Sequence, residues 1–334
     1  MTSLMRLEAL EAPEAVSRCL ARSDFAALGK RLQSLDPPFI LLSARGSSGH
    51  VGTVLRYVLA QELGLVAAAG MPSVASVYGV NQKLAGALFL AVSQSGKSPD
   101  LVAQAQSVRA GGAFTLAIVN DAASPLAAAC EAVLDIHAGP ERSVAATKTV
   151  LSSLAAGLAL IEAWSGRYRP GLARLPERLR ESVGLDWSEL ERLLVQVRNL
   201  FIVGRGPGLG IAEEAGLKLA ETCRLPALAF STAELAHGPQ VLADAAFPIV
   251  ALLAHDPALT TARAVLEPLA ARAPLLSTVD VPGATRLPQL PPDDPVCDLA
   301  SLLLRFYLAA EVAAGSLGRD PDHPPGLAKI THTV

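Results

Sequence analysis

The sequence has few of the features that mark secreted, metal-binding or aromatic-rich proteins. Its 334 residues contain four cysteines, Cys19, Cys130, Cys223 and Cys297, with no CxxC pair and no histidine-rich neighbourhood. This spacing argues against a disulfide framework or a zinc site and favours a reducing cytoplasm. Aromatic residues make up only 4% of the chain. Ala, Leu and Val therefore form the core, which suits helices packed on a buried parallel sheet.

Charge and hydropathy exclude further classes of protein. The net charge is −3 and no run carries a single sign, so nothing indicates binding to nucleic acid or to a membrane surface. No apolar run reaches the roughly 18–20 residues that a membrane-spanning helix needs. The first residues, MTSLMRLEALEAPEAV, lack the cationic stretch and apolar core of a secretory signal. We therefore expect a cytoplasmic globular protein.

Three short apolar runs of the first half recur in the second half at one offset of 160 residues. They are FILLSARGSSG (39–49), LFLAVS (88–93) and FTLAIVN (114–120), and their counterparts are NLFIVGRGPGLG (199–210), PIVALL (248–253) and PLLSTVD (274–280). Short apolar runs closed by turn formers are typical of buried parallel strands. Ala/Leu-rich stretches of helical length separate them, so each half predicts a βαβαβ unit.

The same pattern predicts the domain organisation. Long apolar helices are expected at 147–164 and 298–315, towards the end of each half, and the basic stretch 165–187 fits a connector with a short helix. The predicted fold is α/β, with two tandem doubly wound, flavodoxin-like parallel-sheet lobes. The predicted bounds are 25–165 for the first lobe, 188–318 for the second and 319–334 for a C-terminal tail.

Two Gly/Ser-rich loops of the first half are expected where such a sheet binds ligands. Residues 93–98 (SQSGKS) and 44–49 (ARGSSG) each follow a predicted strand and open a predicted helix, and Ser98-Pro99 is a typical helix start. Ligands bind at the carboxyl ends of parallel strands, where helix N-termini favour anions. An ordinary turn would explain either loop alone, whereas the pair favours a phosphate pocket.

Charged side chains of the second half allow two interpretations. Glu214, Lys218 and Glu221 have spacings of i, i+4 and i+7, so they share one face of a predicted apolar helix. The simpler interpretation is a solvated face with Glu–Lys pairs, and the alternative is a functional cluster. His237 follows in a polar loop, and Lys329 lies in the tail, where a lysine is normally solvated.

Five separated motifs resemble those of the sugar isomerase (SIS) superfamily, specifically the isomerase half of glucosamine-6-phosphate synthase. In chain order they are SQSGKSPD (93–100), VAATKT (144–149), EAGLKLAET (214–222), ELAHGP (234–239) and LAK (327–329). The resemblance covers nearly the whole chain, and SQSGKSPD is also similar to the SIS-type glucosamine-6-phosphate deaminases. It implies a sugar-phosphate substrate, with neither a metal nor a cofactor.

The resemblance also implies catalytic roles. Glu221 corresponds to the base that moves a proton between C1 and C2 of the sugar, and Lys218 to the lysine beside that base. His237 corresponds to the ring-opening histidine, which the family supplies across a homodimer interface. Lys329 corresponds to a tail lysine that can form a Schiff base with the open-chain ketose. Such an imine acidifies the adjacent C–H bond.

The implied sugar-phosphate contacts include several departures from the family pattern. The phosphate-binding residues would be Ser47, Ser93, Gln94, Ser95 and Ser98. Arg45 replaces the family's cysteine and has no assigned role, whereas Ser47 replaces a threonine and keeps the hydroxyl. Ala146 replaces a serine that could contact the sugar, and Lys97 replaces a glutamate.

The expected reaction follows from one further difference. The synthase begins with a glutaminase domain and its cysteine nucleophile, whereas this sequence has only about 25 residues before the first predicted lobe. We therefore expect no glutamine hydrolysis by that route, and deamination of glucosamine 6-phosphate to fructose 6-phosphate and ammonia. The alternatives are another phosphosugar aldose–ketose isomerase, a fructosamine-phosphate deglycase, or a non-catalytic sugar-phosphate sensor.

Overall fold

The structure, a computed structural model, describes residues 2–21 and 24–329 and contains two compact units. The β1–β5 unit comprises Glu14–Glu141, Lys148–Leu172 and the tail from Ala328. The β6–β10 unit comprises the start of the chain up to Pro13, together with Arg142–Thr147 and Ala173–Leu327. Residues 330–334, the end of the predicted tail, lie outside the described residues.

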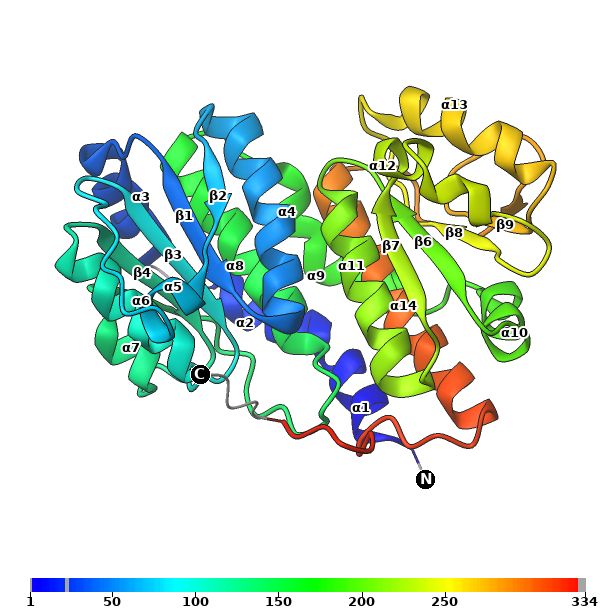
Figure 1. The fold of residues 1–334 in the computed structure, drawn as a ribbon, viewed down its shortest axis with the longest axis horizontal. Helices are drawn as coiled ribbons and strands as arrows, with labels where there is room; N and C mark the ends of the chain where they lie inside the picture. The colour runs from blue at the N-terminus through cyan, green and yellow to red at the C-terminus, as the bar shows by residue number, and fades with distance from the viewer. Residues whose placement is uncertain (1, 22–23, 330–334) are drawn as a thin grey trace. The chain divides into compact units, whose positions relative to one another are not determined.

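The β1–β5 unit contains a five-stranded parallel sheet in the order β2-β1-β3-β4-β5 (Figure 1). The strands are β1 (Ile40–Ala44), β2 (Ala67–Ala69), β3 (Leu88–Ser93), β4 (Phe114–Val119) and β5 (Ala132–Asp135). Every residue of β3 and β4 is buried, as expected for central strands that helices cover on both faces.

The helices of this unit form two packed groups. They are α2 (Ala12–Leu20), α3 (Asp24–Leu35), α4 (Gly46–Leu63), α5 (Pro72–Ser76), α6 (Pro99–Ala110), α7 (Pro125–Ala129) and α8 (Lys148–Ser165). Helices α3 and α4 pack on α8, whereas α5 and α7 pack on α6. Almost all of α8 is buried, which explains why its sequence lacks an amphipathic period and confirms the apolar helix expected at 147–164.

The β6–β10 unit repeats this topology, with the strand order β10-β9-β8-β6-β7. Its strands are β6 (Leu200–Gly204), β7 (Ala227–Ser231), β8 (Ile249–Ala251), β9 (Leu275–Ser277) and β10 (Thr285–Arg286). Strands β6 and β7 begin 160 residues after β1 and β2, so the offset found in the sequence is a structural repeat. Both sheets have the flavodoxin-like order. The predicted class, two tandem doubly wound α/β lobes, is confirmed.

The helices of the β6–β10 unit include one long apolar helix, against which several of the others pack. They are α1 (Leu4–Leu10), α9 (Pro170–Ser182), α10 (Ser188–Gln196), α11 (Gly208–Lys218), the π-helix η1 (Leu219–Cys223), α12 (Thr232–Ala236), the 3₁₀-helix η2 (Pro239–Leu242), α13 (Leu259–Ala270) and α14 (Pro295–Ser316). Helices α1, α10 and α11 contact α14, which confirms the helix expected at 298–315. Helix α9 is the short helix expected within 165–187.

Helix α1 was not anticipated from the sequence. Its first N–H groups, those of Leu4 and Met5, each donate to the carboxylate of Asp322 at 2.7 Å. Its Glu8 carboxylate in turn accepts the backbone N–H of Arg142 and of Ser143. A seven-residue helix is too short to be stable alone, so these distant partners stabilise it.

Burial of the cysteines makes a simple test of the fold. All four are buried, and burial raises the pKa of the Cys130 thiol to about 12 and also raises that of Cys223. Because the thiolate is the reactive form, a disulfide reagent at pH 8 should leave the folded protein unlabelled and should label four thiols after denaturation. Rapid labelling of the native protein would contradict these packed cores.

No helix in residues 2–21 and 24–329 has both the length and the apolar character needed to cross a bilayer.

Candidate active site

The SQSGKS loop joins β3 to α6 in the β1–β5 unit. Ser93 is buried, and its Oγ accepts the N–H of Gly96 at 3.1 Å. Ser95 is half-buried, and its Oγ accepts the N–H of Lys97 at 3.3 Å. Ser98 is the N-cap residue of α6, yet its hydroxyl makes no capping hydrogen bond. The loop thus ends at a helix N-terminus with Gln94, Ser95 and Ser98 only partly buried, an arrangement that can bind an anion.

Gly96 is required by the shape of this loop. Its φ is +61°, and a Cβ atom there would lie 2.1 Å from Ser124 Oγ. The carbonyl of Gly96 also accepts the N–H of Leu126 at 3.0 Å, so the backbone cannot shift without losing that hydrogen bond.

Substituting Gly96 should therefore damage both the fold and anion binding. In Gly96→Ala we expect a loss of about 1–3 kcal/mol in the free energy of unfolding, because the new methyl overpacks the loop. Millimolar inorganic phosphate should raise the melting temperature of the parent protein but not that of Gly96→Ala. Gly79→Ala is the matched control, since Gly79 has φ +64° with nothing within 4 Å of a Cβ. Equal losses in the two variants would show that only backbone strain matters.

The ARGSSG loop lies beside the SQSGKS loop, because β1 and β3 are paired and Ala44 is in register with Val92. Ser47 is half-buried in the first turn of α4. Arg45, which had no assigned role, donates through Nε and Nη2 to Oδ2 of Asp100 at 2.9 and 2.7 Å. Asp100 is fully buried in the first turn of α6. Arg45 therefore ties the first loop to the helix that follows the second loop.

In the β6–β10 unit, Glu214, Lys218 and Glu221 form a contiguous ionic cluster. Lys218 Nζ lies 3.6 Å from Glu214 Oε1 and also donates to Glu221 Oε2. The hydroxyl of Tyr307, from α14, donates to Glu214 Oε1 at 3.0 Å. Glu214 and Lys218 are 1% and 0% exposed. The solvated-face interpretation is therefore wrong, because α14 packs against this side of α11.

Glu221 differs from its two partners in backbone and in exposure. It lies in the π-helix η1, which Arg224 ends with a φ of +51°. Single turns of π-helix are rare and often occur at functional sites. The Glu221 side chain is 17% exposed, against 1% for Glu214 and Lys218. The sequence predicted one uniform helix, and no local signal indicated the π-turn.

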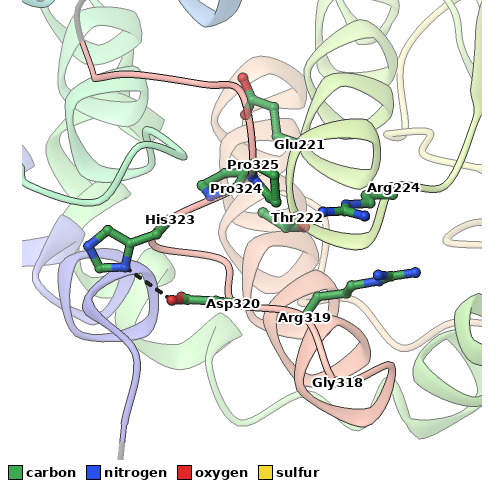
Figure 2. A pocket seen from close by; sticks show the side chains of 9 residues that line it. All are labelled: Glu221, Thr222, Arg224, Gly318, Arg319, Asp320, His323, Pro324 and Pro325. Atoms are coloured by element: carbon green, nitrogen blue, oxygen red, sulfur yellow. Dashed lines mark hydrogen bonds and ion pairs between the residues drawn. The ribbon is translucent and has the colours of Figure 1, made fainter.

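Glu221 lines a pocket that the segment after α14 helps to form. Figure 2 shows this pocket, with Glu221 and Thr222 contributed by η1 and Pro324 and Pro325 by the segment after α14. Its other lining residues are Arg224, Gly318, Arg319, Asp320 and His323. Glu221 is thus the member of the ionic cluster that a small molecule can reach.

His237 is exposed and follows α12, where its N–H donates to the carbonyl of Glu234 at 3.1 Å. Among the described contacts, none joins His237 to Glu221 or Lys218. Ala146 is half-buried in the segment 142–147, whose first residues are held by Glu8. The structure therefore groups Glu221 with Lys218.

Lys329 is ion-paired within the β1–β5 unit. Its Nζ donates to Glu141 Oε2 at 3.0 Å, and its side chain is 22% exposed. A simply solvated tail lysine, the ordinary expectation, is therefore wrong. Glu141 was missed from the sequence, where it stands just before the VAATKT motif without any pattern that marks it. Within residues 2–21 and 24–329, no three His, Cys, Asp or Glu side chains are grouped so that they could hold a metal ion.

Comparison with known proteins gives a consistent result. The profile of the SIS domain matches residues 36–163. Glutamine–fructose-6-phosphate aminotransferase (isomerizing) of Thermus thermophilus is 34% identical over 264 residues, which are 72% of this chain and 43% of that protein. The chain spans about half the length of the curated relatives it matches.

Solved structures extend the likeness to the whole fold. One from Silicibacter pomeroyi DSS-3, provisionally named a phosphosugar isomerase, is 42% identical with a TM-score of 0.92, and the match covers 96% of this chain and 100% of that one. Glucosamine-6-phosphate deaminase from Thermotoga maritima is 20% identical with a TM-score of 0.75, covering 97% and 100%. The second likeness shows the fold alone.

Proposed function

Because this chain belongs to the SIS domain family, we propose that it is an amino-sugar-phosphate isomerase that converts glucosamine 6-phosphate to fructose 6-phosphate and ammonia. The observation that carries the proposal is the Glu221–Lys218 pair. A carboxylate held by a buried lysine and reaching a pocket is what a base for C–H proton transfer requires. A protein that only bound the sugar phosphate would need the SQSGKS and ARGSSG loops (the serine loops) but no such ion pair.

In this proposal the loops of the β1–β5 unit hold the phosphate. Their half-buried hydroxyl and amide groups and the α4 and α6 N-termini supply hydrogen bonds and a favourable dipole. The residues assigned to this task are Ser47, Ser93, Gln94, Ser95 and Ser98. Ser93 Oγ accepts the N–H of Gly96, which holds the loop and leaves the hydroxyl proton available as a donor.

The remaining residues carry the chemistry. Glu221 removes the C2 proton of the open-chain aldehyde and returns a proton to C1, which leaves an imine at C2. Lys218 holds the Glu221 carboxylate in place. The Lys329 amine adds to the C2 imine and displaces ammonia, and water then hydrolyses the lysine imine to the ketone and the free amine. The reverse reaction begins with the same lysine imine of the open-chain ketose. We propose that His237 opens the sugar ring from the partner subunit of a homodimer, as the resemblance of the ELAHGP motif implies.

The test follows both products from glucosamine 6-phosphate. We expect ammonia and fructose 6-phosphate in equal amounts, and a Lys329→Ala variant that deaminates much more slowly. Interconversion of aldose and ketose phosphates without ammonia would instead establish a plain isomerase, which should depend less on Lys329. Release of an amino acid, without ammonia, from a fructosamine phosphate would establish a deglycase. If sugar phosphates raise the melting temperature but none is turned over, the protein is a non-catalytic sugar-phosphate sensor.

The plain isomerase is the second candidate, and one feature of the chain favours it. Ala146 lacks the hydroxyl that the family pattern places next to the sugar, so this chain can accept a substrate of different shape at that position. The relative from Silicibacter pomeroyi, at 42% identity, is provisionally named as a phosphosugar isomerase without a stated sugar. A panel of six-carbon aldose and ketose phosphates run beside glucosamine 6-phosphate separates the two candidates.

A further inference from the structure

Glu141 is a buried carboxylate that the proposed mechanism does not use. It follows β5, precedes α8, and its side chain is 0% exposed. A carboxylate in that position is costly unless it is paired and hydrogen-bonded. Its contacts therefore indicate what it does.

One set of contacts fixes the carboxylate to the first turn of α8. Oε1 accepts the N–H of Thr149 at 3.1 Å, and Oε2 accepts the Thr149 hydroxyl at 2.6 Å. Helix α8 begins at Lys148, so Glu141 satisfies a donor at the positive end of the helix. Both oxygens are thus bound by the first turn of α8, a rigid element of the β1–β5 unit.

The other contact places the tail lysine. Lys329 Nζ donates to Oε2 at 3.0 Å, whereas the residues just before it, Gly326, Leu327 and Ala328, are exposed. A charge-assisted bond to a pre-oriented carboxylate is stronger and more directional than a contact between two mobile side chains. The position of the Lys329 amine is therefore set by Glu141.

We propose that Glu141 is the positioning residue for Lys329, holding the amine of the tail in a fixed place before it reacts with an open-chain ketose phosphate. The inference rests on the proposed function for the imine step but makes a claim about the unliganded protein as well. When the amine adds to the carbonyl, its proton must leave and water must be lost from the carbinolamine. The carboxylate is the adjacent acceptor for that proton.

The first experiment measures the unliganded protein and needs no activity. Lysines are methylated with limiting formaldehyde and cyanoborohydride, and peptide mass spectrometry gives the rate at Lys329 relative to the exposed Lys83. We expect Lys329 to react about tenfold more slowly than Lys83 in the parent protein, and at a similar rate in Glu141→Gln. Equal rates at the two lysines in the parent protein would overturn the inference.

Thr149→Val is the matched control, because it removes a different side-chain hydrogen bond of the same carboxylate while keeping the backbone bond. The variant should lower the melting temperature, because the first turn of α8 loses a hydrogen bond, but methylation of Lys329 should stay slow. If Thr149→Val and Glu141→Gln release Lys329 equally, Glu141 serves only to stabilise the helix.

The second experiment tests the link to chemistry. Borohydride with fructose 6-phosphate should trap an adduct on Lys329, with the yield reduced about tenfold in Glu141→Gln, KM little changed, and no adduct in Lys329→Ala. The double variant Glu141→Gln/Lys329→Ala should turn over as fast as Lys329→Ala, because Glu141 acts through that lysine. Additive losses would overturn the positioning role. If the parent protein gives neither adduct nor turnover but Lys329 is still methylated slowly, the proposed function is refuted, whereas the placement of the Lys329 amine by Glu141 stands.

Discussion

Glu221→Gln is expected to lower kcat by about 10²–10⁴-fold, the usual contribution of a positioned general base. Glutamine has the same shape and can still accept a hydrogen bond from Lys218, so the local structure should persist. What it cannot do is take the C2 proton. The melting temperature should stay close to that of the parent protein, and sugar phosphate should still raise it, because the serine loops are untouched.

The control for this variant is Glu213→Gln. Glu213 neighbours Glu214 on the same helix, is half-buried, and has no part in the ionic cluster. It should retain full activity. Turnover and thermal shift measured on both variants test whether Glu221 is the base. If Glu221→Gln keeps more than a tenth of the parent kcat, the base is another residue, whatever the stability of the variant.

Lys218→Met is expected to lower the free energy of unfolding by about 3–5 kcal/mol, the usual cost of removing one partner of a buried ion pair. Lys218 is 0% exposed and is the cation between Glu214 and Glu221. Methionine fills a similar volume, so the loss reports the missing charge more than a cavity. Chemical denaturation of the purified variant measures the loss, and Lys30→Met, at an exposed lysine, should change stability by less than about 0.5 kcal/mol.

A second substitution separates the fold from the chemistry. Glu214 is the more deeply buried carboxylate, at 1% exposure, and Tyr307 already donates to it. In Lys218→Met/Glu214→Gln that buried position no longer carries a carboxylate charge, so much of the lost stability should return. Activity should not return, because Glu221 still lacks the lysine that holds it. If the double variant is no more stable than Lys218→Met, the pair with Glu214 is not what makes Lys218 necessary.

Sequence patterns were sufficient for the fold class and for three of the five strands in each sheet, because these features depend on local composition. Strands buried on both faces must be apolar throughout, and parallel strands must be separated by helices, so β1, β3 and β4 and their counterparts β6, β8 and β9 were visible as short apolar runs. The repeat at one offset then paired the two halves. The loops predicted to bind phosphate were visible as well, since Gly and Ser concentrate where a strand turns into a helix, as at Gly96 and Ser98.

Local patterns could not show which faces the fold covers. The spacing of Glu214, Lys218 and Glu221 is the same whether water or α14 lies against it, and only tertiary packing excluded the solvated face. The π-turn at Leu219–Cys223 likewise left no mark in the composition. Helix α1 was missed because its stability comes from Asp322, at the other end of the chain.

The sequence by itself determined the two-sheet architecture, the places where loops meet helix N-termini, and the residue types available for proton transfer. Only the tertiary structure decided how those residues are held. Arg45 is paired with Asp100, Lys329 with Glu141, and Lys218 with both Glu214 and Glu221. The physical reason is that a buried charge must find a partner wherever the fold brings one, and separation along the chain does not limit that choice.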